Sequence, residues 1–220
     1  MKTDGKKNLI AGFILIFMFV MWTVLVVTAD VKPAGVNGTD IGFAEINTRF
    51  HNFTGVDMKL YNITDWLGLV PLFVCMLFGF MGFLQLIKRK NILRVDKDII
   101  ILGIYYVIVI LCYLIFEMIP VNYRPVLING FQEVSYPSST TLLVLSVMPT
   151  LVFQIYRRLE GSILKRVIYI ISVVFCAFMV AGRLVSGVHW LTDIIASVFI
   201  STGLFLIYRG TVLSMCKKGE

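Results

Sequence analysis

A long apolar stretch near the N-terminus decides what kind of fold this chain can adopt. Residues Leu9–Ala29 read LIAGFILIFMFVMWTVLVVTA, and none of these 21 side chains is charged. A helix needs about 20 apolar residues to cross the roughly 30 Å hydrocarbon core of a bilayer. The stretch is therefore long enough to span a membrane as one helix.

The apolar character extends over the whole chain of 220 residues. The residues AVILMFWYC make up 58% of the sequence, only 15% of the residues are charged, and the mean hydropathy is +0.88. An average globular chain has about 25% charged residues. A water-soluble domain of this length cannot bury so much apolar side chain. The composition also excludes disordered, coiled-coil, collagen-like and disulfide-scaffold proteins.

Five further apolar runs follow the first one. They lie at approximately Trp66–Ile87, Ile99–Phe116, Thr141–Tyr156, Val167–Ala181 and Trp190–Tyr208. A backbone inside lipid must satisfy its own hydrogen bonds, so each run is predicted to be a helix. The alternating pattern of a membrane β-barrel is absent from the sequence. We therefore predict an all-α membrane protein, a six-helix transmembrane bundle that forms a single integral membrane domain.

Lysine and arginine are distributed unevenly between the connections. Fifteen of the twenty lie near the N-terminus, in residues 88–97, in residues 157–166 and in the C-terminal tail. Cytoplasmic loops carry the excess of basic residues, so this side is predicted to be cytoplasmic. Both termini then lie inside, and residues 30–65, 117–140 and 182–189 face outward.

This orientation also explains the net charge of +7. No basic face with interleaved aromatic residues is present, so we expect the bilayer and not a nucleic acid as the partner. The compact loops and short tail favour a bacterial plasma membrane. The first run has one alternative interpretation, a cleaved signal peptide with Val27-Thr28-Ala29 as its cleavage site, although the run is longer than a usual signal core.

Two outward stretches, far apart in sequence, carry the residues suited to bind an anion. Residues 117–140 contain Arg124, Ser138 and Ser139, and residues 182–189 contain Arg183. The predicted topology places both stretches at one end of the bundle. Two guanidinium groups, hydroxyls and the free N–H groups of a helix N-terminus make a phosphate or sulfate site.

A histidine and an aspartate lie in the second of these stretches and just after it. His189 and Asp193 are spaced i, i+4 at the start of the sixth run, which places them on one helix face. A carboxylate that accepts the proton of one imidazole nitrogen leaves the other nitrogen as a nucleophile or base. An ionisable residue inside a membrane span is a functional candidate.

These residues resemble the motifs of the type 2 phosphatidic acid phosphatase and haloperoxidase superfamily. Its third motif, S-R-x5-H-x3-D, is matched by Arg183, His189 and Asp193 at the same spacing, with Gly182 in place of the serine. Its second motif, P-S-G-H, corresponds here to residues 137–140, which read PSST. Its first motif, K-x6-R-P, corresponds to residues 117–125, where only the final Arg-Pro remains.

The resemblance implies a six-span fold and a lipid phosphate phosphatase without metal or cofactor. Arg124, Arg183, Ser138, Ser139 and Thr140 would bind the phosphate. The third-motif histidine, His189, would attack phosphorus and form a phosphohistidine, with Asp193 supporting it, and water would then release phosphate. The substrate would be a phosphate monoester or a pyrophosphate of a lipid, bound at the extracytoplasmic face.

Two departures from the family pattern affect this prediction. The family's second-motif histidine protonates the leaving alkoxide, but Thr140 stands at that position. General acid catalysis is worth about 10²–10⁴ in rate, so another acid is needed, and Glu133 in the same loop is the first candidate. The family's first-motif lysine is replaced by Glu117, which would weaken anion binding if its side chain pointed inward.

Two alternative functions follow from these departures. The chain could be a binder of lipid phosphates that has lost catalysis, which Thr140 and Glu117 favour. It could also be a lipid phosphotransferase that forms the same histidine intermediate and passes the phosphoryl group to another acceptor. The sequence does not indicate the acyl or isoprenyl group of the substrate or the oligomeric state.

Overall fold

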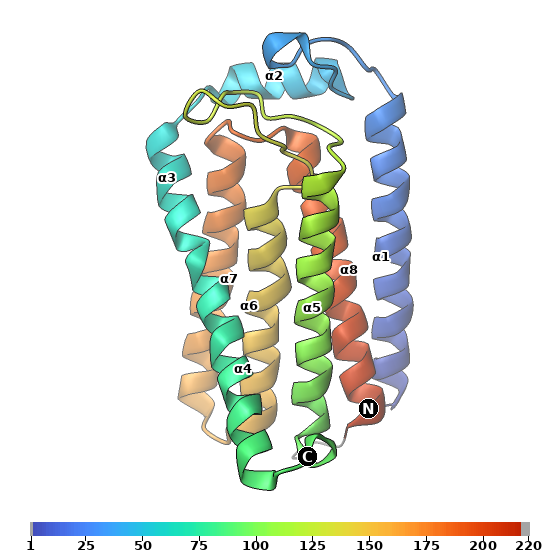
Figure 1. Ribbon diagram of the computed structural model, residues 1–220, viewed down its shortest axis with the longest axis vertical. Helices are drawn as coiled ribbons and strands as arrows, with labels where there is room; N and C mark the ends of the chain where they lie inside the picture. Colours follow the sequence, from blue (N-terminus) through green and yellow to red (C-terminus); the bar gives the residue numbers. More distant parts are fainter. Residues whose placement is uncertain (1, 217–220) are drawn as a thin grey trace.

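The computed structural model describes residues 2–216, which form a bundle of long helices (Figure 1). Six helical segments are long and apolar enough to cross a membrane, which confirms the predicted fold class. Lys217 and Lys218, which contribute to the predicted charge distribution, lie outside the described residues. The long helices are α1 (Lys2–Thr28), α4 (Leu69–Arg89), α5 (Lys97–Met118), α6 (Ser139–Arg158), α7 (Ser162–Val185) and α8 (Leu191–Met215).

The connections between these helices gather at two ends of the bundle (Figure 1). Residues 29–57, 119–138 and 186–190 lie at the upper end in Figure 1, which we call the loop end. Residues 90–96 and 159–161 lie at the opposite end, which we call the basic end. The chain therefore brings together the three stretches that the sequence analysis places on one side.

The expected outer loop of residues 30–65 is in fact largely structured. It contains α2 (Ala44–Thr54), which lies across the loop end in Figure 1, and most of α3 (Met58–Leu67), which continues into α4 after Gly68. The Asp57 carboxylate accepts the backbone N–H groups of Lys59 and Leu60 and so caps α3. The second span thus begins at Met58, eight residues before the expected Trp66. The helix starts at its Asp57 cap and not at the first residue of the apolar run.

Helices α6 and α8 occupy the centre of the bundle, and the other helices surround them. Buried residues are most frequent in α6 and α8, whereas α4 and α1 expose most of their apolar side chains. Phe17 on α1 and Met76 on α4 are both more than 60% exposed. Apolar side chains exposed around a bundle of this composition face lipid and not water.

Helix α1 packs on α8 through glycines that allow close approach of the two backbones. A Cβ atom added at Gly12 would lie 2.9 Å from the carbonyl oxygen of Gly203, and one added at Gly210 would lie 2.9 Å from that of Gly5. Small residues at such contacts let membrane helices gain van der Waals packing. The four glycines therefore set the distance at which α1 lies against the central helix.

Candidate anion-binding site

Two arginines from distant parts of the chain converge at the loop end around one aromatic ring. The guanidinium carbon of Arg183 lies 4.8 Å from the centroid of the Tyr61 ring, and that of Arg124 lies 5.7 Å from it. Cations placed this close to an aromatic ring are attracted by its quadrupole. Tyr61, which is itself 8% exposed, therefore helps to hold two like charges together.

Each arginine is placed by a different element. Arg183 lies in the last turns of α7 and is 1% exposed. Arg124 lies in residues 119–138, whose two arms pair through the bridge between Tyr123 and Val134. In this pairing the backbone N–H of Arg124 donates to the carbonyl of Glu133, and the Arg124 side chain is buried.

Both buried guanidinium groups retain N–H groups that lack a described partner. These are the Nη1 atom of Arg124 and the Nε atom of Arg183. A buried polar group without a hydrogen bond is costly, and a buried charge more so. Convergent unpaired donors of positive charge make this place suited to an anion with several acceptor oxygens, such as phosphate.

His189 lies beside the arginines in the connection between α7 and α8. Its Nδ1 atom is 3.1 Å from the carbonyl oxygen of Ser135, and its Nε2 atom is 3.1 Å from Nη2 of Arg183. A carbonyl only accepts and a guanidinium only donates, so Nδ1 carries the proton and Nε2 offers its lone pair. The unprotonated nitrogen thus faces Arg183 and accepts its N–H.

The surroundings of His189 keep its ring neutral. The side chain is buried, and burial is the main cause that lowers its pKa well below the usual 6.5. The positive charges of Arg124 and Arg183 lower this pKa further, while the hydrogen bond to Ser135 raises it. A neutral imidazole is the form that acts as a nucleophile.

Asp193 supports the histidine loop mainly through the backbone. Its Oδ2 atom accepts the N–H of Trp190 at 2.9 Å, which caps α8, and its Oδ1 atom accepts the amide of Asn122 at 3.3 Å. Its Oδ2 atom lies 3.7 Å from Nδ1 of His189, too far for a strong hydrogen bond. In this structure the direct partner of Nδ1 is therefore the Ser135 carbonyl, while Asp193 orders the residues on both sides.

The N-terminus of α6 lies next to this group. Ser138 is fully buried, and its N–H donates to the carbonyl of Asp193 while its hydroxyl donates to Thr141. Ser139 and Thr140 follow in the first turn of α6 and are half-buried. The first N–H groups of a helix have no partner within it, so this turn adds donors at the same end of the bundle.

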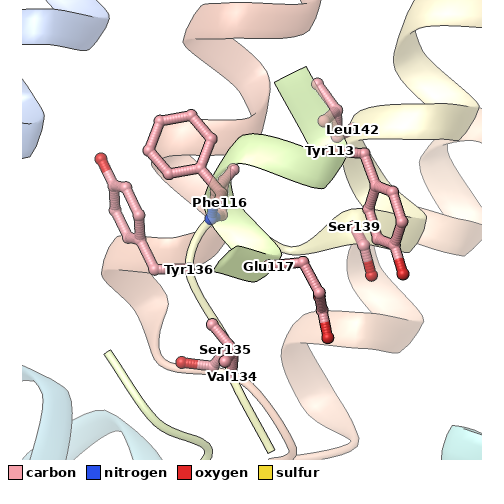
Figure 2. Close-up of a pocket in the computed structure, with 9 residues that line it drawn as sticks. Tyr113, Phe116, Glu117, Val134, Ser135, Tyr136, Ser139 and Leu142 are labelled. Atoms are coloured by element: carbon pink, nitrogen blue, oxygen red, sulfur yellow. The ribbon is translucent and has the colours of Figure 1, made fainter. Parts of the chain in front are cut away.

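The two glutamates of the sequence analysis have different surroundings. The Oε2 atom of Glu133 lies 3.1 Å from Nε of Arg124, so this side chain reaches the arginine group. Glu117 lines a small pocket of about 10 Å³ together with Ser135, Tyr136 and Ser139 (Figure 2). That volume suits about one water molecule. Within residues 2–216 no ion pair joins Glu117 to either arginine, so Glu117 does not occupy the anion site.

Three residues of this site were missed by the sequence analysis. Tyr61 and the Ser135 carbonyl have no signal in the sequence, because only the tertiary structure brings them to the arginines and the imidazole. Asp65 could have been noticed as a carboxylate directly before the second apolar run. Its Oδ1 atom lies 3.5 Å from Nη1 of Arg183.

A lateral cavity of about 460 Å³ lies beside this group, on the side of Asp65. Asp65, Ser139 and Thr140 line its polar end. Leu69, Leu72 and Ile110, which also line the cavity, are exposed on the apolar surface. Asp65, which lies 3.5 Å from Arg183, thus stands between the arginine group and a cavity that opens on the apolar surface. Within residues 2–216 no three His, Cys, Asp or Glu side chains are grouped as metal ligands.

Comparison with known proteins agrees with this architecture. A crystal structure described as the first transmembrane PAP2 type phosphatidylglycerolphosphate phosphatase, from Bacillus subtilis, is similar in fold, with a TM-score of 0.66 and 16% identity. The match covers 94% of this chain and 98% of that one. No curated protein sequence matches the chain. The sequence model of the PAP2 superfamily matches residues 72–213, about two thirds of the chain, and this integral membrane protein therefore belongs to the PAP2 superfamily.

Proposed function

We propose that the protein hydrolyses a phosphate monoester or pyrophosphate of a lipid through a phosphohistidine, at the extracytoplasmic face. One observation carries the proposal: the Nε2 lone pair of a buried neutral histidine faces Arg183, which shares the Tyr61 ring with Arg124, and both arginines have unpaired N–H groups. Arginine pairs stabilise the charge of a transferring phosphoryl group, and the imidazole nitrogen supplies the nucleophile.

The first half of the reaction forms the covalent intermediate. The arginines Arg124 and Arg183 bind the phosphate oxygens, and Arg183 turns its N–H away from Nε2 of His189 toward the substrate. The nitrogen then attacks phosphorus while the bond to the lipid oxygen breaks. The carbonyl of Ser135 holds the ring by its Nδ1 proton, 3.1 Å away, and stabilises the positive charge that the ring acquires.

The leaving lipid oxygen needs a proton, and Asp65 is better placed to supply it than Thr140 or Glu133. Asp65 reaches Arg183 and also lines the cavity that opens toward lipid. When the phosphate replaces Asp65 at Arg183, the carboxylate takes up a proton from solvent and then passes it to the leaving oxygen. Glu133 likewise reaches one arginine, Arg124, but it does not line that cavity. In the second half, Asp65 takes a proton from water, the water oxygen attacks phosphorus, and the bond to His189 breaks to release phosphate.

The lateral cavity explains why the substrate should be a lipid. Its polar end contains Asp65, which lies 3.5 Å from Arg183, and its apolar end opens between α4 and α5 on the surface that faces lipid. A phosphate placed at the arginines would therefore leave its hydrocarbon chain in or near the membrane. A water-soluble phosphate would gain nothing from the apolar part of the cavity.

The test is phosphate release by purified protein from phosphatidate, lysophosphatidate and isoprenyl pyrophosphate. We expect His189→Ala to lose at least about 10³-fold in rate, since the nucleophile is gone. His51 is the other histidine of the chain and packs on Trp190 at the same end, so His51→Gln is the matched control and should remain active. Equal rates of wild type and His189→Ala would refute the proposal.

One alternative is favoured by a specific residue. Thr140 stands where the family has its acid, and this favours a protein that binds lipid phosphate without turnover. Trapping a phosphohistidine that is absent from His189→Ala would exclude this binder. Products formed with added acceptor alcohols would then separate hydrolysis from phosphotransfer.

A further inference from the structure

A second lipid-sized cavity lies far from the proposed catalytic group, between α6, α7 and α8. It has a volume of about 680 Å³, and its walls are mostly apolar. Leu145, Pro149 and Val152 line it from α6, Val173 and Cys176 from α7, and Phe205 from α8. We call it the inner groove. Its position does not depend on the function proposed above.

The inner groove has the length of one leaflet. It extends along α6 from Leu145 to Arg157, twelve residues apart, which is about 18 Å of helix. Half of the hydrocarbon core is about 15 Å thick. The groove begins near the middle of the bundle and ends at the basic end, so it can accept an acyl chain from one side of the membrane only.

The basic end of the groove is positively charged. Arg157 and Arg209 both line it, and their guanidinium carbons lie 5.7 Å and 6.0 Å from the centroid of the Phe153 ring. Tyr156 and Tyr169 line the same end and are about half exposed. Exposed tyrosines are typical of the level of lipid headgroups.

The described carboxylates near this end are shared among several arginines. Asp98 is 1% exposed and pairs with Arg157 at 3.5 Å and with Arg158 at 2.7 Å. Asp96 pairs with Arg158 and Arg89. These two carboxylates thus face three arginines, and among the described residues no carboxylate pairs with Arg209. An anion at this end of the groove would lie close to the positive charge of Arg209.

We propose that the inner groove binds an anionic glycerophospholipid of the cytoplasmic leaflet, with its phosphodiester at Arg157 and Arg209 and one acyl chain along α6 and α7. The length selects a lipid from one leaflet, the apolar walls select its chain, and the two arginines that line its basic end select a negative headgroup. Basic residues between membrane helices on the cytoplasmic side bind such headgroups. The buried hydroxyl of Ser172 lies on the groove wall and can donate to a lipid ester oxygen.

The test is native mass spectrometry of delipidated protein with phosphatidylglycerol and with phosphatidylcholine of the same acyl chains. We expect one phosphatidylglycerol to bind in preference to phosphatidylcholine. Arg209→Gln should weaken phosphatidylglycerol binding about fivefold, the loss expected for one basic residue near a headgroup. Val173→Trp, at an exposed position in the groove, should weaken binding of both lipids by filling it.

Two control variants separate this groove from other surfaces. Arg166→Gln removes an exposed arginine of the same end that does not line the groove, and it should bind like wild type. Arg49→Gln removes an exposed cation of α2, at the opposite end of the bundle, and should also leave this binding unchanged. The proposal is overturned if Arg209→Gln and Val173→Trp bind like wild type or if both lipids bind equally. It is also overturned if the loss follows Arg49→Gln, or if a second copy of the chain occupies the groove.

Discussion

At the scale of single residues, the environment of His189 determines what its imidazole can do. The Ser135 carbonyl holds the proton on Nδ1, and Arg183 directs its N–H to Nε2. Because a carbonyl can only accept and a guanidinium can only donate, these two hydrogen bonds alone fix the tautomer of the imidazole. Burial and two nearby positive charges then keep the ring neutral.

The lowered pKa of His189 predicts how stability depends on pH. The unfolded chain binds this proton near pH 6.5 and the folded chain only at lower pH, so the free energy of unfolding falls as pH drops below 6.5. The loss is at most about 1.4 kcal/mol per pH unit until the folded pKa is reached. Melting temperatures of wild type and His189→Gln between pH 7.5 and 5 measure it. Parallel curves for the two proteins would contradict the prediction.

The proposed role of Asp65 predicts a loss of rate that depends on the leaving group. An alkyl phosphate needs a proton on its leaving oxygen, so Asp65→Asn should lower kcat for a lipid phosphate about 10²–10⁴-fold. A nitrophenyl phosphate leaves as a stable anion and should be hydrolysed nearly as fast as by wild type. Steady-state kinetics with both substrates provide the measurement.

Glu133→Gln is the matched control for this experiment. Glu133 pairs with Arg124, and we expect its loss to alter binding of both substrates alike. If Glu133→Gln shows the selective loss instead, the proton donor is Glu133. If Asp65→Asn slows both substrates equally, Asp65 only positions Arg183.

At the scale of helices, the contact between α1 and α8 depends on glycines, which have no side chain to keep the two backbones apart. Gly12 and Gly203 face each other in the middle of this contact, and Gly5 and Gly210 do so near the basic end. The hydrophobic effect does not join helices inside lipid, so close packing has to supply the attraction. Helix α8 also carries Asp193, so this packing stabilises the element that supports the histidine loop.

Gly12→Leu is expected to separate α1 from α8. The new Cβ would lie 2.7 Å from the Ile207 side chain and 2.9 Å from the carbonyl of Gly203, and a backbone atom cannot easily give way. Overpacking of this kind costs about 1–3 kcal/mol or more. Thermal unfolding in detergent should show a clear loss of stability.

The control for this variant is Gly79→Leu in α4, where a Cβ would meet no atom within 4 Å. This variant should unfold within a few degrees of wild type. Equal destabilisation by the two variants would mean that the cost comes from replacing a helical glycine and not from the α1 and α8 contact.

At the scale of the whole molecule, the fold separates two kinds of charge. The arginines of the proposed catalytic group are buried at the loop end, while the basic end carries exposed cations such as Lys88, Lys90 and Arg94. An excess of lysine and arginine marks the cytoplasmic side of a membrane protein. We therefore expect the loop end to lie outside the cell.

This orientation can be measured with an impermeant maleimide on intact cells, in a background with the four native cysteines changed to alanine. Phe131 is 73% exposed at the loop end, and Leu93 is 83% exposed at the basic end. We expect Phe131→Cys to react on intact cells and Leu93→Cys to react only after permeabilisation. The reverse result would place the proposed catalytic group in the cytoplasm.

Much of this fold could be predicted from the sequence. Apolar runs of about 20 residues can only be helices in lipid, and their number and alternating direction place residues 119–138 and 186–190 at one end. The residues at which the helices begin and end were harder to predict from the sequence. Helix α3 begins at Met58 because Asp57 caps it, and a polar helix start before an apolar run gives no hydropathy signal.

The sequence by itself determined the membrane class, the connections that share one end of the bundle and the spacing of His189 and Asp193, because each depends on neighbours within a few residues or on the order of the apolar runs. Only the tertiary structure decided how the group is held: Tyr61 under both arginines, the Ser135 carbonyl on the imidazole and Asp65 at Arg183. These contacts join residues 54 to 122 positions apart, and no local pattern specifies which side chains meet across such distances.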